Sequence, residues 1–248
     1  MRVDVILGPQ QITPGEVAGR VVAVIDVLRA STTIAVALAN GARAVIPVDS
    51  SDEVVRRSKA FERRDVRLAG ERRMLMVPGF DYGNSPAEFT RPAVEGKTVI
   101  LSTTNGTGAL LAVQGARDVV VASYVNFSAA LALLRTAARG GTDVAIVCAG
   151  RDRQFSLEDA ACAGRYVRHV GDGIDGVEMN DAARAAELLD RRYEGDLDHL
   201  FADAAHGQAL AEAGFAEDLE LCAAVDSHPV VPIFADRQIT RLGPDRER

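Results

Sequence analysis

Short runs of β-branched apolar residues alternate with helix-like segments through the first 150 residues of the chain. Seven runs have the length and composition of strands, at residues 3–7, 21–25, 44–48, 66–68, 98–101, 119–122 and 144–147. Alanine- and leucine-rich segments with helical spacing separate most of them, at 32–40, 52–63, 108–114 and 127–139. Apolar strands that alternate with helices are typical of a parallel sheet that is covered on both faces. We therefore expect an α/β protein, a three-layer sandwich with a mostly parallel sheet.

The pattern changes after about residue 171. Residues 171–176 are rich in turn-forming residues, and residues 180–224 have helical spacing with many acids. Two short strand-like runs follow, at 230–234 and 238–242. We expect an α/β core over 1–170, a closely packed, more helical C-terminal lobe with two closing strands over 171–242, and a charged, disordered tail over 243–248.

Charge and composition exclude several classes of protein. The formal net charge of −7 argues against a nucleic-acid binder, whose surface is expected to be basic. The three cysteines lie far apart and in no CxxC or Cys/His spacing, so neither a disulfide framework nor a zinc site is indicated. The longest charge-free apolar run, 119–134, is shorter than the roughly 20 residues of a membrane helix. Because the polar N-terminus does not fit a signal peptide either, we expect a cytoplasmic protein without nucleic-acid or membrane partners.

A weak internal repeat relates residues 24–57 to residues 99–135. Aligning the Gly-Ala-Arg turns at 41–43 and 115–117 places two hydroxyl-rich segments at equivalent positions. The alternative is that any two strand-helix-strand units resemble each other. If the repeat is real, the two hydroxyl-rich segments occupy matching places in the fold.

Three corners, each directly after a strand-like run and before a helix-like segment, carry polar side chains. Open α/β sheets bind ligands at the carboxyl ends of their strands. A helix N-terminus also offers unpaired N–H groups and the positive end of the helix dipole, which favour an anion. Ser and Thr at such positions also serve as plain N-caps. Taken together, the three corners indicate a phosphate or sulfonate site that also holds a metal ion.

The first corner begins with Asp26, and Arg29 follows three residues later. A carboxylate at the end of an apolar strand needs a partner, which could be a metal ion, Arg29 or the next helix N-terminus. Aspartate-nucleophile phosphatases of the haloacid dehalogenase type have a second Asp two positions further on, where this chain has Leu28. The candidate anion ligands at this corner are the hydroxyls of Ser31, Thr32 and Thr33.

The second corner lacks the lysine and the spacing of a P-loop, so it does not predict a nucleotide site. Its hydroxyl and N–H groups could hold the oxygens of a tetrahedral anion, with helix capping as the alternative. The residues are Thr103, Thr104, Asn105, Gly106 and Thr107.

The third corner carries Arg151, with Glu158 and Asp159 at the start of the following helix-like segment. Two adjacent acids are favoured there by the helix dipole alone, and they are also the oxygen ligands that Mg²⁺ prefers. The same two interpretations apply to Glu71, and to Asn84 as a polar ligand, in the long segment 70–90. Long loops in compact domains are uncommon unless they are functional.

The four histidines form no set. His169 and His199 lie in helical stretches and are expected at the surface or in the core. His206 precedes a glycine and His228 precedes a proline. Either could donate a proton, but a role in a turn is the interpretation we favour for both.

Several segments, taken together and in order, resemble the 2-phosphosulfolactate phosphatase family. The resemblance runs from about residue 3 to residue 234, nearly the whole chain. The segments are long and unrelated to the motifs of common folds, which makes the match specific. They are residues 26–33, 70–72, 79–81 with 84–86, 103–107, 156–164, and 218–222 with Asp226.

The resemblance implies a magnesium-dependent phosphatase that converts 2-phosphosulfolactate to 3-sulfolactate and phosphate, in coenzyme M synthesis or in sulfolactate formation. It also implies an α/β fold with two intimately packed lobes. Two alternatives stay open. The first is a metal-dependent hydrolase of another small phosphorylated acid, and the second is a non-catalytic anion-binding protein. The sequence leaves open whether the chain forms a homo-oligomer.

On this basis we expect Asp26, Arg29 and Glu71 to be catalytic. One Mg²⁺ would be held by Asp26, Glu71 and Asp159. Arginine suits the binding of phosphate, carboxylate and sulfonate groups, so Arg29 and Arg151 are the expected anion partners. The attacking group is water or Asp26 itself, and the absence of a second Asp favours water.

Overall fold

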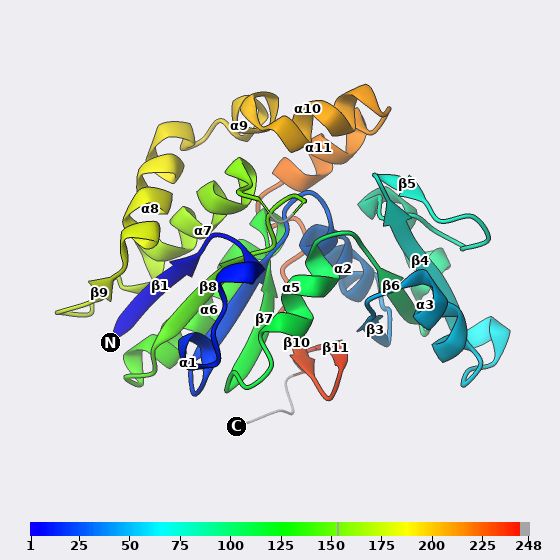
Figure 1. Cartoon of the computed structure of the whole chain (residues 1–248), viewed down its shortest axis with the longest axis horizontal. Coiled ribbons are helices and arrows are strands. Elements are labelled where there is room, and N and C mark those ends of the chain that lie inside the picture. The colour runs from blue at the N-terminus through cyan, green and yellow to red at the C-terminus, as the bar shows by residue number, and fades with distance from the viewer. Residues whose placement is uncertain (153, 244–248) are drawn as a thin grey trace.

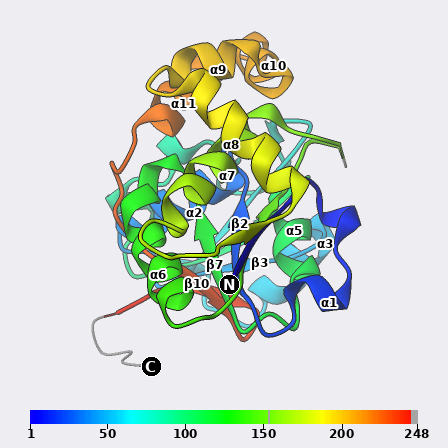
Figure 2. The ribbon, with the colours of Figure 1, turned by 90° about the vertical axis from the view of Figure 1, so that its left-hand side faces the viewer.

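A sheet of eleven strands forms the centre of the molecule, and helices cover both of its faces (Figures 1 and 2). The computed structural model describes residues 1–152 and 154–243. The predicted α/β fold with a mostly parallel sheet is confirmed. The strands are β1 (Arg2–Ile6), β2 (Val21–Ile25), β3 (Ala44–Pro47), β4 (Val66–Arg72), β5 (Leu75–Met76), β6 (Thr98–Ser102), β7 (Asp118–Ala122), β8 (Val144–Cys148), β9 (Glu178–Met179), β10 (Pro232–Ala235) and β11 (Gln238–Arg241).

The sheet contains two groups of parallel strands, in the overall order β5-β4-β6-β3-β11-β10-β7-β2-β8-β1-β9. One group consists of β4, β6 and β3, and the other of β7, β2, β8, β1 and β9. The short β5 pairs antiparallel with the end of β4. Every residue of β2, β6 and β8 is buried, which explains why these strands are mainly apolar rather than alternating between apolar and polar residues.

The hairpin of β10 and β11 joins the two parallel groups. Ile233 of β10 pairs antiparallel with Val120 of β7, and Ile239 of β11 pairs antiparallel with Val45 of β3. The two strands expected at the end of the chain are therefore present, but they lie in the middle of the sheet rather than closing an edge. The boundary expected near residue 171 stays a prediction, although this hairpin belongs to the central sheet.

Two helices carry the chain between the parallel groups. α2 (Ala30–Ala39) connects β2 to β3, and α5 (Gly106–Ala112) connects β6 to β7. These are the two segments of the weak internal repeat, and each crosses from one group to the other. All residues of α2 from Ala30 to Leu38 are buried because the fold surrounds this helix, and the three hydroxyl side chains of its first turn are buried with the apolar residues that follow.

The remaining helices flank the sheet and cover its carboxyl edge. In Figure 1, α9, α10 and α11 lie above the carboxyl ends of the strands. The 3-10 turns are at residues 9–11, 63–65, 86–88 and 124–126. The helices are α1 (Pro14–Val17), α3 (Ser51–Ser58), α4 (Arg91–Val94), α6 (Phe127–Arg139), α7 (Leu157–Val170), α8 (Asp181–Tyr193), α9 (Leu197–Asp203), α10 (Ala205–Glu212) and α11 (Ala216–Ala223).

Two expected boundaries differ from the structure. The helix expected over 52–63 ends at Ser58, where the chain turns toward β4. The segment expected as a loop from residue 70 begins as the end of β4 and then forms β5. Of the expected tail, residues 244–248 lie outside the described residues.

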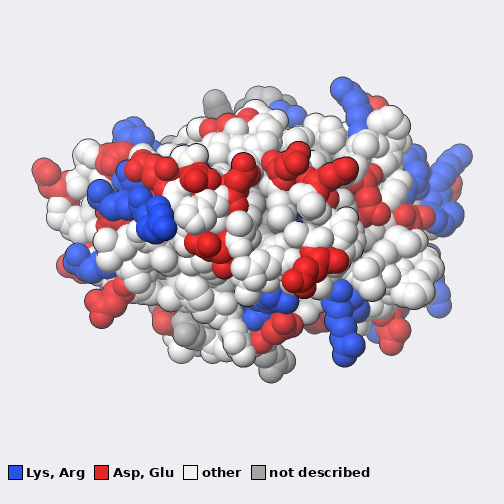
Figure 3. All heavy atoms as spheres, turned by 90° about the horizontal axis from the view of Figure 1, so that it is seen from above, with Lys and Arg blue, Asp and Glu red and all other residues white. Residues whose placement is uncertain are grey.

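The surface above the carboxyl edge is rich in acids. Figure 3 shows Asp and Glu side chains across the middle of this face, with Lys and Arg in separate groups around them. The face shown therefore presents no continuous basic patch of the kind that tracks a nucleic-acid backbone. Among the described residues, no helix has the length and apolar character needed to cross a membrane.

Candidate active site

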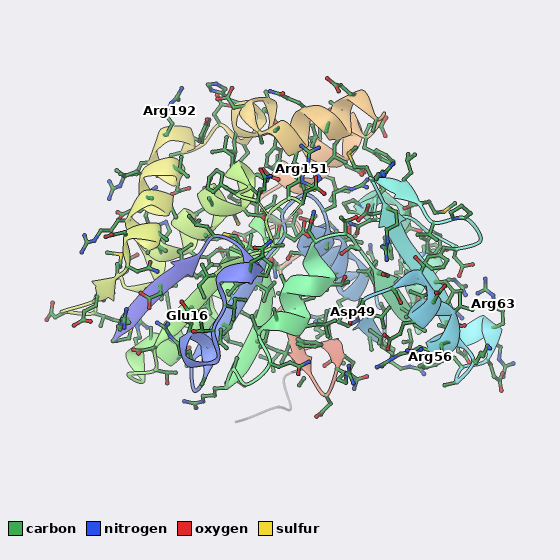
Figure 4. The ribbon with its side chains drawn as sticks, viewed as in Figure 1. Glu16, Asp49, Arg56, Arg63, Arg151 and Arg192 are labelled. Carbon is green, nitrogen blue, oxygen red and sulfur yellow. The ribbon has the colours of Figure 1, made fainter. Side chains whose placement is uncertain are left out.

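A pocket of about 310 Å³ opens at the carboxyl edge of the sheet. Its walls come from the ends of β2, β4, β6 and β8 and from α10. Figure 4 shows Arg151 in this region, between the strand ends and the C-terminal helices. The location is the one that open α/β sheets use for ligands. The pocket is lined by Asp26, Leu28, Arg29, Glu71, Arg73, Met74, Asn84, Thr103, Thr104, Asn105, Arg151, Asp152 and His206.

Asp26 lies at the base of the first corner and is 5% exposed. Its carboxylate accepts a hydrogen bond from the backbone N–H of Ala30 at 3.3 Å. The pKa of Asp26 is raised from 3.8 to about 6, mainly because the carboxyl group is buried. The carboxylates of Glu71 and Glu158 also raise this pKa, whereas His206 and the Ala30 N–H act to lower it. A carboxyl group that titrates near neutrality in a pocket is typical of a functional site.

Glu71 lies near the end of β4 and connects two sides of the pocket. It accepts hydrogen bonds from the backbone N–H of Thr104 at 2.7 Å and from the Thr104 hydroxyl at 3.1 Å. The backbone N–H of Met74 also donates to Glu71, at 2.9 Å. Each carboxylate oxygen has two lone-pair sites, so Glu71 keeps acceptor capacity for a ligand.

Arg29 is held by three groups from two distant parts of the chain. Its guanidinium donates to Asp218 at 2.7 Å and to the Met74 carbonyl at 2.9 Å, and it stacks on Phe215 at 4.3 Å. Asp218 in α11 also accepts a hydrogen bond of 2.6 Å from the Ser85 hydroxyl. Both Arg29 and Asp218 are buried, so the C-terminal helices fix the orientation of a pocket residue.

Asp218 was not among the predicted site residues. It lies almost two hundred residues after Arg29, and spacing cannot reveal such a pairing. The available signal was that Asp218 belongs to one of the segments that resemble the family.

The second corner approaches Asp26 closely. A Cβ atom added at Gly106 would lie 2.6 Å from Asp26 Oδ2 and 2.5 Å from Ala30 Cβ, so only glycine fits there without a shift. Thr103, Thr104 and Asn105 line the pocket. The backbone N–H of Asp152 donates to Asn105 Oδ1 at 3.1 Å, which joins the second corner to the third.

The other predicted hydroxyl ligands point into the fold. The Ser31 hydroxyl donates to the Val24 carbonyl, and the Thr32 hydroxyl donates to the Val27 carbonyl. The Thr33 and Thr107 hydroxyls likewise donate to backbone carbonyls, those of Asn84 and Thr103. These four side chains and Gly106 are not among the residues that line the pocket; the hydroxyls hold the two corners in shape.

Asn84 does line the pocket, and it is 4% exposed. Its Oδ1 atom is buried and has no hydrogen-bond partner among the described residues. Buried polar atoms in folded proteins are nearly always paired. An unpaired amide oxygen at a pocket wall therefore indicates an acceptor that would be satisfied by a hydrogen-bond donor bound in the pocket.

At the third corner, Arg151 faces the pocket and Asp159 does not. The two carboxylate oxygens of Asp159 accept the backbone N–H groups of Val27 at 2.9 Å and Gly150 at 3.1 Å. Burial raises the pKa of Asp159 well above its usual value, and the Glu158 and Asp26 carboxylates act in the same direction. Asp159 thus holds the first and third corners together.

His206 is a pocket residue for which the sequence leaves a proton-donor role open but favours a role in a turn. The expectation of a turn role is wrong, because His206 lies in α10 and lines the pocket. His228 lies in a turn-rich segment between α11 and β10, and His169 and His199 lie in helices as expected. A histidine followed by glycine gave no signal of a helix, because glycine is a poor helix former.

The predicted metal ligands divide into two that face the pocket, Asp26 and Glu71, and one that does not, Asp159. Among the described residues, no group of three or more His, Cys, Asp or Glu side chains is arranged to hold a metal ion. Mg²⁺ usually keeps several waters and binds through one or two carboxylates plus substrate phosphate. Asp26 and Glu71 fit that mode of binding, and the three-carboxylate set does not.

The fold and the pocket together define a class of protein. It is an α/β protein whose carboxyl-edge pocket combines carboxylates with arginines, which suits a small anion. Within this class, the sequence model of the family described as 2-phosphosulpholactate phosphatase matches residues 6–237, and the chain belongs to this family. The resemblance seen in the sequence is confirmed.

Similar proteins are known from several bacteria. A relative from Symbiobacterium thermophilum is 43% identical over 227 residues, which cover 92% of this chain and 96% of that protein. A relative from Clostridium acetobutylicum is 35% identical over 239 residues, covering 96% of this chain and 100% of that protein. One from Thermotoga petrophila is 36% identical over 234 residues, covering 94% and 96%. Each is named "Probable 2-phosphosulfolactate phosphatase".

Proposed function

We propose that the chain is a magnesium-dependent phosphatase that hydrolyses 2-phosphosulfolactate to 3-sulfolactate and phosphate. The observation that carries the proposal is the pairing of Asp26 and Glu71 with arginines in one pocket, in a family whose relatives bear that name. A cytoplasmic location and a place in coenzyme M synthesis are predictions from the sequence alone.

The charges of the pocket support a requirement for a cation. The substrate carries a phosphate, a carboxylate and a sulfonate, about four negative charges in all. The pocket offers equal numbers of positive and negative side chains, so it does not offset this charge by itself. The side chains are those of Arg29, Arg73 and Arg151 on one side and Asp26, Glu71 and Asp152 on the other.

Each pocket residue has a part in this proposal. Asp26 and Glu71 hold Mg²⁺, which when bound offsets the charge on a phosphoryl oxygen. Arg151 binds an anionic group of the substrate. The unpaired Oδ1 atom of Asn84 is an acceptor, so it is suited to a water molecule rather than to an anionic group. The attacking group is water, because the position two residues after Asp26 is Leu28 rather than a second Asp.

Phosphate release is the direct test. We expect release from 2-phosphosulfolactate with Mg²⁺, little release after removal of the metal with EDTA, and little from phospholactate, which lacks the sulfonate. Equal release from both substrates would favour a hydrolase of another phosphorylated acid, and a substrate panel would then identify it. No release from either substrate by the folded protein with Mg²⁺ would contradict the phosphatase and favour an anion-binding protein.

Asp26→Asn tests the assigned site. This substitution is expected to lower kcat at least about 100-fold. It removes the negative charge of the Asp26 carboxylate, and with it several kcal/mol of transition-state stabilisation. Asp65→Asn is the matched control, since Asp65 lies in a 3-10 turn outside the pocket. Near-normal turnover by Asp26→Asn would contradict the assignment.

A further inference from the structure

We propose that His206 donates the proton to the leaving oxygen and that Glu158 positions it; this inference rests on the proposed phosphatase function. His206 is the one histidine among the described residues that line the pocket. It comes from α10, one of the helices that Figure 1 shows above the carboxyl ends of the strands, whereas Asp26 and Glu71 come from the ends of β2 and β4. A group from α10 can reach the departing part of a substrate whose phosphate lies near the two carboxylates.

The pairing with Glu158 fixes the imidazole. Nδ1 of His206 lies 3.1 Å from Glu158 Oε1, and the side chains of the two residues are 11% and 2% exposed. A buried carboxylate needs a hydrogen-bond donor, so Nδ1 carries its hydrogen toward Glu158. Nε2 is then the nitrogen left for a ligand.

The helix that carries His206 is itself held in place. The guanidinium of Arg151 donates to the Ala205 carbonyl at 2.7 Å, so a pocket residue ties down the first residue of α10. On the other side, a Cβ atom added at Gly207 would lie 2.0 Å from the Phe201 carbonyl oxygen. Gly207 therefore lets α10 approach the end of α9 more closely than any other residue would, and His206 is positioned between these two contacts.

The reaction needs a proton donor because its leaving group is poor. The bond between phosphorus and the substrate oxygen breaks, and that oxygen keeps the electron pair and takes the Nε2 proton, which gives the alcohol of sulfolactate. The water oxygen bonds to phosphorus. One proton of the water stays on the phosphate and the other passes to solvent, which returns a proton to the imidazole. General acid catalysis of this kind contributes typically about 10²- to 10⁴-fold.

His206→Asn is the decisive variant. Its amide N–H can still donate a hydrogen bond to Glu158, but an amide is too weak an acid to transfer a proton to the leaving group. His206→Gln is a second variant in case the first is poorly folded. His228→Gln is the control, since His228 does not line the pocket. Phosphate release gives kcat and KM for 2-phosphosulfolactate, and calorimetric titration with inorganic phosphate measures the binding site separately.

We expect both His206 variants to lose at least about 100-fold in kcat, with KM and phosphate affinity within about threefold of the original protein. A kcat within about threefold would overturn the inference. A parallel loss of kcat and phosphate affinity would also overturn it, because His206 would then bind or shape the pocket rather than donate a proton. If the unmodified protein releases no phosphate, it is the proposed function that fails.

Glu158→Gln tests the positioning role. It keeps the size of the side chain but removes the carboxylate, so it is expected to lower kcat by less than the His206 variants, with KM unchanged. Unchanged kcat in Glu158→Gln would remove Glu158 from the proposal. A rise in KM without a fall in kcat would assign it a structural part in substrate binding.

Discussion

At the residue scale, two carboxyl groups at or near the pocket are buried, and burial makes their charged forms unfavourable. Asp26 is buried at the end of β2, and burial raises its pKa to about 6. Asp159 is buried beside it, and burial likewise raises its pKa well above the usual value, although its two oxygens accept backbone N–H groups. Such groups weaken the folded state and are retained where function needs them.

The raised pKa of Asp26 predicts a pH-dependent gain in stability for Asp26→Asn. The folded state holds this proton more tightly than the unfolded state, whose pKa is near 3.8. The contribution of Asp26 to stability is therefore complete below about pH 3.8 and is lost as the pH rises through about 6. At about pH 7 to 8, Asp26→Asn is expected to have the higher free energy of unfolding, by up to about 3 kcal/mol.

Urea unfolding of both proteins in EDTA, at several pH values from about 4 to 8, measures this difference. The difference should shrink as the pH falls from about 6 to 4. A difference that does not change with pH would show that the Asp26 carboxyl is not the group that titrates.

At the scale of elements, the start of α5 depends on a glycine. Gly106 lies against both Asp26 and Ala30, which begins α2, so the two crossover helices meet at the pocket. Gly108, two residues further along the same helix, has nothing within 4 Å of its Cβ position. The two glycines therefore give a matched pair of substitutions.

Gly106→Ala is expected to lower the free energy of unfolding by about 1–3 kcal/mol, because the added methyl group must displace Asp26 or Ala30. It should also lower kcat, since it moves a residue assigned to the reaction. Gly108→Ala should leave kcat unchanged and raise stability by up to about 1 kcal/mol, as alanine favours a helix. Thermal unfolding and phosphate release test both variants, and equal effects from the two would contradict this assignment.

Asp218 of α11 holds the guanidinium of the pocket residue Arg29 in place. Asp218→Asn leaves the buried Arg29 guanidinium without its charged partner, so it is expected to cost about 3–5 kcal/mol of stability. KM for the substrate should rise as Arg29 loses its fixed orientation. Glu217→Gln, an exposed position on the same helix, is the control for denaturation and kinetics. Unchanged KM in a folded Asp218→Asn would contradict the positioning of Arg29 by α11.

The sequence allowed the elements around the site to be predicted better than the directions of their side chains. β-branched runs locate β2, β6 and β8, and the polar residues after them locate the corners. Whether a hydroxyl such as that of Thr32 or Thr104 faces the pocket depends on tertiary packing, which local spacing does not encode. For the same reason the sequence does not place His206 or Asp218 at the pocket, because they come from helices distant in sequence, although it leaves a proton-donor role for His206 open.

At the scale of the whole molecule, one sheet is assembled from two parallel groups and a hairpin. The alternation of strands and helices predicted the parallel sheet, but it carries no information on strand order. β10 and β11 pair with β7 and β3, which are far from them in sequence. Their insertion between the groups could not be inferred, because strand pairing across such distances leaves no periodic pattern.

Ile239→Ala tests the importance of this junction. Ile239 is fully buried in β11 and pairs with Val45, so truncation is expected to cost about 2–4 kcal/mol in the free energy of unfolding. Gln238→Ala, at an exposed position of the same strand, should change it by less than about 0.5 kcal/mol. Hydrogen exchange should speed up in both β3 and β7, and faster exchange in only one of them would contradict a joining role.

The hairpin also has a consequence for synthesis. Residues 232–241 leave the ribosome after every strand that they join. Until they do, the nascent chain presents two open sheet edges, one at β3 and one at β7, with unpaired N–H and C=O groups. Until the hairpin is in place, these edges are open to pairing with other chains, so we expect the chain to be most prone to edge-to-edge association while its last strands are being synthesised.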